Sequence, residues 1–306
     1  MPSNPLQSFR YDKPMMSAFI ERLRQYAFRR LTRSGLGLFL KSNDIISASP
    51  QTTGEYDPDI NRLMDLFVQL GHGDFLIDVG ANVGLTSCQN GNKFRWVHMY
   101  EPNPICAQVL RANCMLMLAS VPHEIHAFAL SDIDGSEVLR IPKHNWGGAF
   151  IHRENSYPDQ VLSTKDGFST ISDGNYILVD VSIKSTSVEL ARVFFELVAN
   201  NLTRGVIKID VEGYEEKILS HIVDIIPSSM ECFVVLESWN TSSKFGEIAA
   251  RSARTIDVYK YATSPTLLNW SSPKSSFVTT KRLQAMTGEN WRGDIVVHIK
   301  PETVST

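Results

Sequence analysis

The chain has 306 residues, a formal net charge of −3 and a hydrophobic fraction of 43%. This length suits one large α/β domain, alone or with an N-terminal extension, and the apolar content excludes an intrinsically disordered chain. The near-neutral charge argues against nucleic acid as the main partner, and the sequence lacks the run of about 20 apolar residues that a transmembrane helix needs.

Residues 1–50 are predicted to form a helical N-terminal extension. Apolar residues recur at helical spacing between Met15 and Arg33, and the rest of this segment carries arginines. Those arginines are Arg22, Arg24, Arg29, Arg30 and Arg33. A basic amphipathic helix of this kind can lie on an anionic membrane surface or bind a partner protein. The alternative is a helix that packs on its own domain and exposes its arginines to solvent.

Residues 51–306 are predicted to form a single domain in which strands alternate with helices. Short apolar runs indicate the strands, and longer periodic segments, one opening with a proline, indicate the helices. The predicted strands are Phe75–Val79, Trp96–Tyr100, Ile125–Leu130, Val206–Ile209 and Cys232–Leu236. The predicted helices are Tyr56–Leu70, Leu85–Phe94, Pro104–Leu118 and Tyr214–Ile226. This alternation predicts a mostly parallel sheet with helices on both faces.

Residues 137–186, approximately, interrupt the alternation and are predicted to form a β-rich insertion. The insertion includes strand-like segments at Glu137–Ile141 and Tyr176–Lys184. Near the C-terminus, Ile256–Tyr261 and Asp294–Lys300 could form an antiparallel pair of strands.

The four cysteines, Cys88, Cys106, Cys114 and Cys232, form no CxxC pair and fit no zinc-binding spacing. All four lie in apolar segments, which is typical of reduced thiols in the core of a cytosolic protein. Because the N-terminal stretch also lacks an apolar signal region, we expect a cytoplasmic protein.

Two acidic residues follow neighbouring strands. Asp78 lies near the end of the first strand, in the pattern D-x-G-x-x-x-G, and Glu101 follows the second strand, 23 positions later. Ligands of parallel α/β sheets bind beyond the carboxyl ends of the strands, where an acid at about this spacing binds ribose hydroxyls. A carboxylate beside Gly80 and Gly84 would repel a phosphate, and the P-loop and dinucleotide motifs are absent. A ligand with a ribose, no phosphate and a positive centre is S-adenosylmethionine.

The motifs DVGANVG at 78–84, YEPNP at 100–104, ALSD at 129–132 and IKIDVEGYE at 207–215 occur in this order. Together they resemble the FkbM family of class I S-adenosylmethionine-dependent methyltransferases over about residues 54–240. The resemblance implies a Rossmann-like α/β fold with a mixed, seven-stranded sheet.

The resemblance also implies roles for particular residues. The cofactor-binding residues would be Asp78, Gly80, Asn82, Gly84, Glu101, Asn103, Ser131 and Asp132. The acids near the transferred methyl group would be Asp210 and Glu212, after the fourth strand, and Glu237, after the fifth. The GEYDP segment, which contains Glu55, resembles the segment that precedes the first strand in the family.

Three further residues have predicted roles outside the cofactor site. His144 and Trp146, in a loop of the insertion, could contact the acceptor, because aromatic faces suit sugars and flat rings. The alternative is an ordinary loop with a partly buried tryptophan. Family members commonly carry an aspartate where this chain has Ser187, and we expect this serine to cap a helix instead.

The expected reaction is methyl transfer from S-adenosylmethionine to a hydroxyl oxygen of a small molecule or a glycan. A hydroxyl needs a general base, which Asp210, Glu237 or a histidine of the insertion could provide. We expect no metal in the acidic cluster. The alternatives are a cofactor-binding module that serves a partner without turnover of its own, and a nucleic-acid methyltransferase. The latter commonly has a proline-aromatic motif where this chain has Asp210-Val-Glu-Gly.

Overall fold

A computed structural model of the chain describes residues 15–42, 46–143, 145–153, 157–165, 171–238, 245–252, 254–265, 279–286 and 293–302. The α-helices are α1 (Met15–Leu31), α2 (Ala48–Thr52), α3 (Pro58–Gln69), α4 (Leu85–Asn90), α5 (Pro104–Met117), α6 (Asp159–Lys165), α7 (Thr186–Ala199), α8 (Glu215–Ile225) and α9 (Phe245–Arg251). Short 3₁₀ helices are η1 (Gly91–Lys93), η2 (Trp146–Gly148) and η3 (Asp173–Asn175).

The strands form two sheets. The larger sheet has the order β11-β10-β12-β9-β8-β1-β2-β3, and the smaller has the order β4-β7-β5-β6. The strands of the larger sheet are β1 (Phe75–Val79), β2 (Trp96–Tyr100), β3 (His123–His126), β8 (Arg204–Ile209), β9 (Glu231–Ser238), β10 (Ile256–Pro265), β11 (Thr279–Ala285) and β12 (Gly293–Ile299). Those of the smaller sheet are β4 (Ala129–Ser131), β5 (Gly135–Pro142), β6 (Phe150–Ile151) and β7 (Tyr176–Ser185).

The larger sheet is parallel from β9 through β8, β1 and β2 to β3, and antiparallel beyond β9. The predicted pairing near the C-terminus is confirmed, because β10 pairs with β12 from Ile256 to Lys260. The expected number of seven strands is wrong by one. The additional strand is β11, which pairs with β10 at the edge of the sheet.

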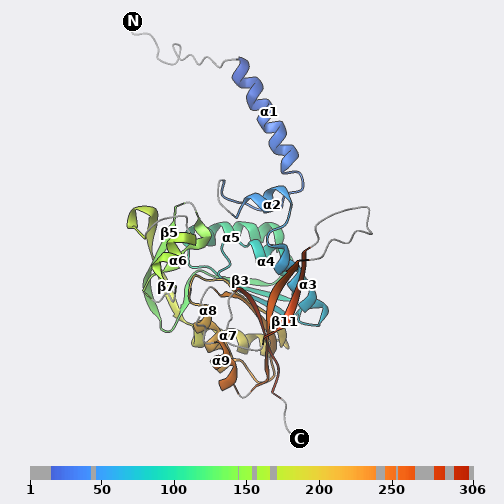
Figure 1. Cartoon of the computed structure of the whole chain (residues 1–306), viewed down its shortest axis with the longest axis vertical. Helices are drawn as coiled ribbons and strands as arrows, with labels where there is room; N and C mark the ends of the chain where they lie inside the picture. The colour runs from blue at the N-terminus through green and yellow to red at the C-terminus, as the bar shows by residue number, and fades with distance from the viewer. Residues whose placement is uncertain are drawn as a thin grey trace.

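Helices cover both faces of the larger sheet, as predicted (Figure 1). Alternate residues of β1 point to opposite faces. Phe75 and Ile77 pack in one core cluster with residues of α7 and α8. Leu76 packs in the other with residues of α3, α4 and α5. Burial on both faces explains why β1 is apolar except for Asp78.

The predicted strand Ile125–Leu130 is two strands in two sheets. β3 ends at His126 and pairs with β2, whereas β4 begins at Ala129 and pairs with β7. The chain therefore passes from the larger sheet to the smaller one at Ala127 and Phe128. Apolar residues continue across this step, so the sequence pattern does not reveal it.

Helix α1 extends away from the rest of the chain (Figure 1). Its apolar side chains are exposed, with fractions of 64% for Phe19, 57% for Leu23 and 65% for Leu31. The alternative in which this helix packs on its own domain is therefore wrong. Among the described residues, no helix is both long and apolar enough to cross a membrane.

Candidate active site

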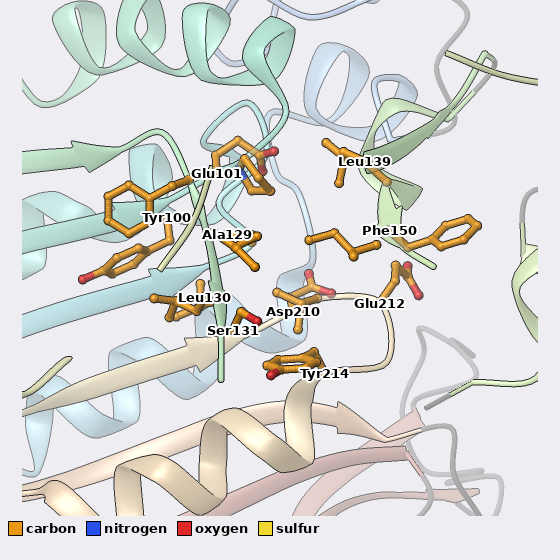
Figure 2. A pocket seen from close by; sticks show the side chains of 18 of the residues that line it. Tyr100, Glu101, Ala129, Leu130, Ser131, Leu139, Phe150, Asp210, Glu212 and Tyr214 are labelled. Carbon is orange, nitrogen blue, oxygen red and sulfur yellow. The ribbon is translucent and has the colours of Figure 1, made fainter. Parts of the chain in front are cut away.

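A cleft with an empty volume of about 860 Å³, counted out to its open mouth, lies at the carboxyl ends of β1, β2 and β8. One wall consists of the loops that follow these strands, including Gly80, Glu101 and Asp210. The opposite wall comes from the smaller sheet, including Leu139 and Phe150 (Figure 2). Binding sites in parallel α/β proteins are expected at this end of the sheet.

Glu101 is a buried carboxylate held by the backbone of two loops. Its Oε2 accepts a hydrogen bond from the Asn82 amide at 2.7 Å, and its Oε1 accepts one from the Asn103 amide at 2.7 Å. Each oxygen keeps a second lone pair, so the carboxylate can accept two more hydrogen bonds. Burial raises the pKa of Glu101 to about 7, although the two backbone hydrogen bonds oppose this rise.

Asn82 forms the turn between β1 and α4 in a left-handed conformation, with φ at 52°. Its side-chain Oδ1 is buried and has no hydrogen-bond partner within the protein. A Cβ on Gly147 would lie 2.6 Å from Asn82 Nδ2, so a larger residue at position 147 would displace the Asn82 side chain. Asn82 therefore lines the cleft and offers an unpaired acceptor to a ligand with a donor group.

The two glycines of the motif are required by contacts within the protein. A Cβ on Gly80 would lie 1.9 Å from the carbonyl oxygen of Asp210. A Cβ on Gly84 would lie 2.7 Å from Leu110 Cδ1 and 2.8 Å from Cys88 Sγ. Both glycines have φ near +85°, at 84° and 88°. Gly80 still lines the cleft, whereas Gly84 lies outside the lining and lets α4 and α5 approach each other.

Asp78 lies beneath the cleft rather than at its surface. It is fully buried, and its Oδ2 accepts a hydrogen bond from Ser87 Oγ. Lys208 Nζ lies 3.4 Å from Asp78 Oδ1 and 2.9 Å from Asp210 Oδ2. Burial opposes charge on Lys208, but the carboxylates of Asp210 and Asp78 leave its pKa raised. Lys208 thus connects the buried acid of β1 to the acid that lines the cleft.

Two of the three predicted catalytic acids line the cleft, and the third, Glu237, follows Leu236, the register partner of Ile209, so it lies at the same strand ends as Asp210. Asp210 and Glu212 line the cleft from the loop after β8, across from Leu139 and Phe150 (Figure 2). Glu237 lies on β9, opposite Asp294 of β12, and is outside the lining.

The predicted adenine-binding residues differ in position. Ser131 lines the cleft, whereas Asp132 and Asn103 lie outside the lining. Asn103 caps α5, because its Oδ1 accepts from the amide of Ile105 at 3.0 Å. Asp132 accepts hydrogen bonds from His221 at 3.0 Å and from Lys217 at 3.1 Å. Partial burial would raise the pKa of Asp132, but these two bonds outweigh it and the pKa is lowered.

The predicted acceptor-binding residues also differ in position. Trp146 lines the cleft, and Lys41 Nζ lies 4.5 Å from the centroid of its ring. Glu55 lies outside the lining and accepts a hydrogen bond from Asn61 of α3 at 3.1 Å. His144 lies outside the described residues.

The capping role predicted for Ser187 is wrong. The N-cap residue of α7 is Ser185, two positions earlier. Ser187 lies in the first turn, where its Oγ is 2.7 Å from His221 Nδ1. The segment KSTSVEL offers several residues that can precede a helix, so the sequence left the boundary ambiguous.

Sequence reasoning missed three residues of the site. Lys208 is the first: a lysine inside an apolar strand needs a partner, and alternation places it on the same side as Asp210. Tyr214 lines the cleft directly after the DVEG motif. Tyr56 lies beside Asp210, and burial together with that carboxylate raises its pKa to about 12. Tyr214 and Tyr56 stand within the quoted motifs, but no spacing rule distinguishes them from core tyrosines.

The lining is acidic where it is charged. Among the described residues that line the cleft, the charged ones are Glu101, Glu137, Asp210 and Glu212, and none is lysine or arginine. Glu137 is paired with Arg153 at 3.0 Å. Asp210 is paired with Lys208, which lies outside the lining, at 2.9 Å. A lining whose charged side chains are all carboxylates favours a ligand that carries positive charge.

The parallel α/β sheet with a cleft at its strand ends is the arrangement expected of a class I methyltransferase. A family model described as the methyltransferase FkbM domain matches residues 78–251, which is more than half of the chain. The chain therefore belongs to the FkbM methyltransferase family.

Other comparisons find more distant similarity. Methyltransferase sdnD of Sordaria araneosa is 26% identical over 215 residues, which cover 68% of this chain and 81% of that protein. The O-methyltransferase from Bacillus cereus in complex with SAH is 10% identical, covers 96% of this chain and 93% of its own, and gives a TM-score of 0.40. Magnesium protoporphyrin IX methyltransferase from Synechocystis PCC 6803 with bound SAM is 7% identical. The match covers 95% of this chain and 100% of that chain, with a TM-score of 0.40. Because both TM-scores are below 0.5, the assignment rests on the family match.

The cofactor of this family, S-adenosylmethionine, fits the residues present. The Glu101 carboxylate can accept both ribose hydroxyls, and the unpaired Asn82 Oδ1 can accept from an ammonium group. The acidic lining suits its positive sulfonium.

We predict that cofactor affinity falls as the pH drops through 7, because the pKa of Glu101 in the free protein is about 7 and ribose binding needs the carboxylate. Below that pH the affinity should fall by up to about tenfold per pH unit. Calorimetric titration between pH 5.5 and 7.5 measures this slope.

The Glu101→Gln variant is the control. Its amide group would place a donor against the Asn82 or Asn103 amide, so affinity should fall by about 1.5–3 kcal/mol, without the pH slope. An unchanged affinity in this variant would refute the ribose assignment.

We also predict that Lys208→Met lowers the free energy of unfolding by about 3–5 kcal/mol, because it leaves the buried Asp78 carboxylate without its cation. Lys217→Met, which breaks the exposed pair with Asp132, should cost about 1 kcal/mol or less. Denaturant unfolding of both variants tests the difference. Similar losses in the two would contradict the role assigned to Lys208.

Proposed function

We propose that the protein transfers a methyl group from S-adenosylmethionine to a hydroxyl oxygen of a small molecule or a glycan. The proposal rests on the position of the Asp210 carboxylate. It lies in the cleft wall, is 54% exposed, and is held through Oδ2 by the Lys208 ammonium at 2.9 Å. A hydroxyl at neutral pH needs a base to become a good nucleophile, and an accessible, oriented carboxylate provides one.

The facing wall supports an acceptor with apolar or ring surfaces. Trp146, Leu139 and Phe150 line that wall, and they come from the smaller sheet. Tyr157 packs with Phe150, and its hydroxyl donates to the buried Glu215 at the start of α8 at 3.0 Å. This hydrogen bond connects the acceptor wall to the loop that carries Asp210 and Glu212. Sugars and flat rings stack well on such aromatic faces.

Bound S-adenosylmethionine supplies an electrophilic methyl group. The residues of the chain orient the acceptor against the wall opposite Asp210, exclude water from the closed end of the cleft, and take the hydroxyl proton on Asp210. Lys208 keeps this carboxylate in one orientation before the proton arrives. Glu212 lies on the same loop and is the second residue that can receive the proton.

The acidic lining supports a small acceptor over a nucleic acid. A polyanion would meet Asp210 and Glu212, and the described lining offers it no cationic side chain. The alternative of a cofactor-binding module without turnover predicts that cofactor binds while no hydroxyl compound is methylated.

We predict that Asp210→Asn keeps cofactor binding and lowers the turnover rate by about 10²–10⁴, the usual effect of losing a general base. Glu212→Gln should lower the turnover rate by a smaller factor. Transfer of a radiolabelled methyl group to a panel of sugars and phenols, with cofactor affinity measured in parallel, tests both variants.

A full rate in Asp210→Asn together with a large loss of rate in Glu212→Gln would assign the base to Glu212 and contradict the role of Asp210.

We also propose that the reaction needs neither Mg²⁺ nor Ca²⁺. A rate that EDTA abolishes and either ion restores would mean that these carboxylates hold a hard cation.

We propose further that α1 binds an anionic membrane surface. Its exposed apolar side chains include Phe19, Leu23 and Leu31, and its arginines suit acidic lipid headgroups. Removing residues 1–33 should abolish sedimentation with phosphatidylserine vesicles and leave turnover on a dissolved acceptor intact. Binding by the full chain should weaken at high salt. A truncation that changes only the oligomer mass, measured by light scattering, would contradict the lipid assignment and indicate a protein partner.

A further inference from the structure

A second group of potential ligands lies outside the cleft, on β2 and the edge strand β3. His98 pairs in register with Glu124, and Tyr100 pairs with His126. Residues two apart on a strand share a face, so His98, Glu124 and His126 all point to the same side of the sheet. The two histidines are buried, and Glu124 is 46% exposed.

The three side chains bring their ligand atoms together. His98 Nδ1 and His126 Nε2 are 3.2 Å apart, and Glu124 Oε2 lies 3.7 Å from the first and 3.8 Å from the second. A point equidistant from all three atoms lies about 2.1 Å from each, which matches the bond lengths of zinc to imidazole nitrogen and carboxylate oxygen. Tetrahedral zinc needs ligand atoms about 3.3 Å apart, so the Glu124 oxygen must move inward by a few tenths of an ångström. Its half-exposed side chain permits that movement.

The surroundings of His126 resemble the second layer of a metal site. His126 Nδ1 lies 3.6 Å from Glu189 Oε1. The same oxygen accepts a hydrogen bond from Tyr100 at 3.2 Å, and Arg192 pairs with this carboxylate at 2.8 Å. A histidine ligand usually directs its second nitrogen to a carboxylate, which fixes the tautomer with the lone pair on the metal-facing nitrogen.

Without a metal, the two imidazoles share a proton. Their rings are nearly coplanar, at 14°, with centroids 5.5 Å apart, as in a straight N–H···N hydrogen bond. His98 Nε2 is buried and has no partner, so the proton can occupy either nitrogen of this ring without losing a hydrogen bond there. Two zinc–nitrogen bonds are longer together than the 3.2 Å between these nitrogens, so a zinc ion would lie off the line that joins them, toward Glu124. Both imidazoles would have to turn toward the ion, and His98 would then carry its proton on Nε2.

We propose that His98, Glu124 and His126 bind one Zn²⁺ ion at this edge of the sheet, with a water molecule as the fourth ligand. Two imidazoles and one carboxylate form a common zinc ligand set, and imidazole favours zinc over magnesium or calcium. The exposed side of Glu124 gives the ion access from solvent.

The proposed ion would affect the methyltransferase site through Tyr100. This residue lines the cleft beside Glu101 and stacks on His126, with ring centroids 4.3 Å apart. Its hydroxyl and His126 both face Glu189. Zinc bound to His126 would fix the ring against which Tyr100 packs.

A comparable cluster elsewhere supplies a matched control. His72, Glu231 and His298 also place three ligand atoms near one another. In that cluster Arg204 Nε lies 3.1 Å from Glu231 Oε2, and a guanidinium at this distance opposes a divalent cation. Beside the proposed site, the guanidinium of Arg192 is paired with Glu189 and Glu196 instead of with a ligand.

The test uses the full chain, freed of metal by a chelator and titrated with Co²⁺ and then Zn²⁺. We expect one Co²⁺ per chain, with the intense visible absorption of tetrahedral cobalt, which one equivalent of Zn²⁺ abolishes. Glu124→Gln, which is nearly isosteric and partly exposed, should weaken the binding at least about tenfold. Zn²⁺ should raise the melting temperature of the unchanged chain but not that of Glu124→Gln. Glu231→Gln should retain the cobalt absorption.

Three results would overturn the proposal: no stoichiometric Co²⁺ binding at micromolar concentration, unchanged binding in Glu124→Gln, or loss of binding in Glu231→Gln but not in Glu124→Gln. His298→Gln is the second control if Glu231→Gln does not fold. Each readout is independent of methyl transfer, so the outcome does not depend on the proposed acceptor.

Discussion

The ion pair that links Asp78, Lys208 and Asp210 connects the core of the sheet to the cleft. Asp78 and Lys208 are direct partners on neighbouring parallel strands. Two charges buried between helices and strands would be costly alone, and each is tolerated because the other is within reach. Lys208 extends this pairing to Asp210, where β8 has ended. The position of the cleft carboxylate therefore depends on a charge inside the core.

The same constraint explains the glycine motif. Asp210 follows β8, which lies beside β1, and its carbonyl oxygen therefore faces Gly80. A Cβ on residue 80 would lie only 1.9 Å from that oxygen, so the space is open only to glycine. The turn that results places the Asn82 amide on Glu101. The Glu101 and Asp210 carboxylates of the cleft are therefore positioned by one set of backbone contacts. The loops after β1, β2 and β8 are therefore held together by direct contacts, although they are far apart in the sequence.

The fold and the identity of the loops that form the site could be predicted from the sequence, because apolar strands and acidic strand ends are local signals. Glu101 and Asp210 were placed at the cleft in this way. The burial of Asp78 was not predictable, since it depends on the register between β1 and β8, which places Lys208 opposite it. For the same reason His98 and Glu124 were not recognised as neighbours: they are paired across two strands, not along one. Trp146 was identified from its residue type alone.

The passage of the chain from β3 to β4 gives this fold its two-sided cleft. At Ala127 and Phe128 the backbone leaves the larger sheet, and β4 then pairs with β7 of the smaller one. One wall therefore belongs to the larger sheet, whereas the other belongs to the smaller sheet. The Tyr157–Glu215 hydrogen bond is one buried contact that joins the two walls. Burial raises the pKa of Glu215 to about 8, which favours the neutral carboxyl at this contact. The smaller sheet is thus held over the cleft by a carboxyl whose burial, together with the nearby charge of Glu212, disfavours a further anion at this point.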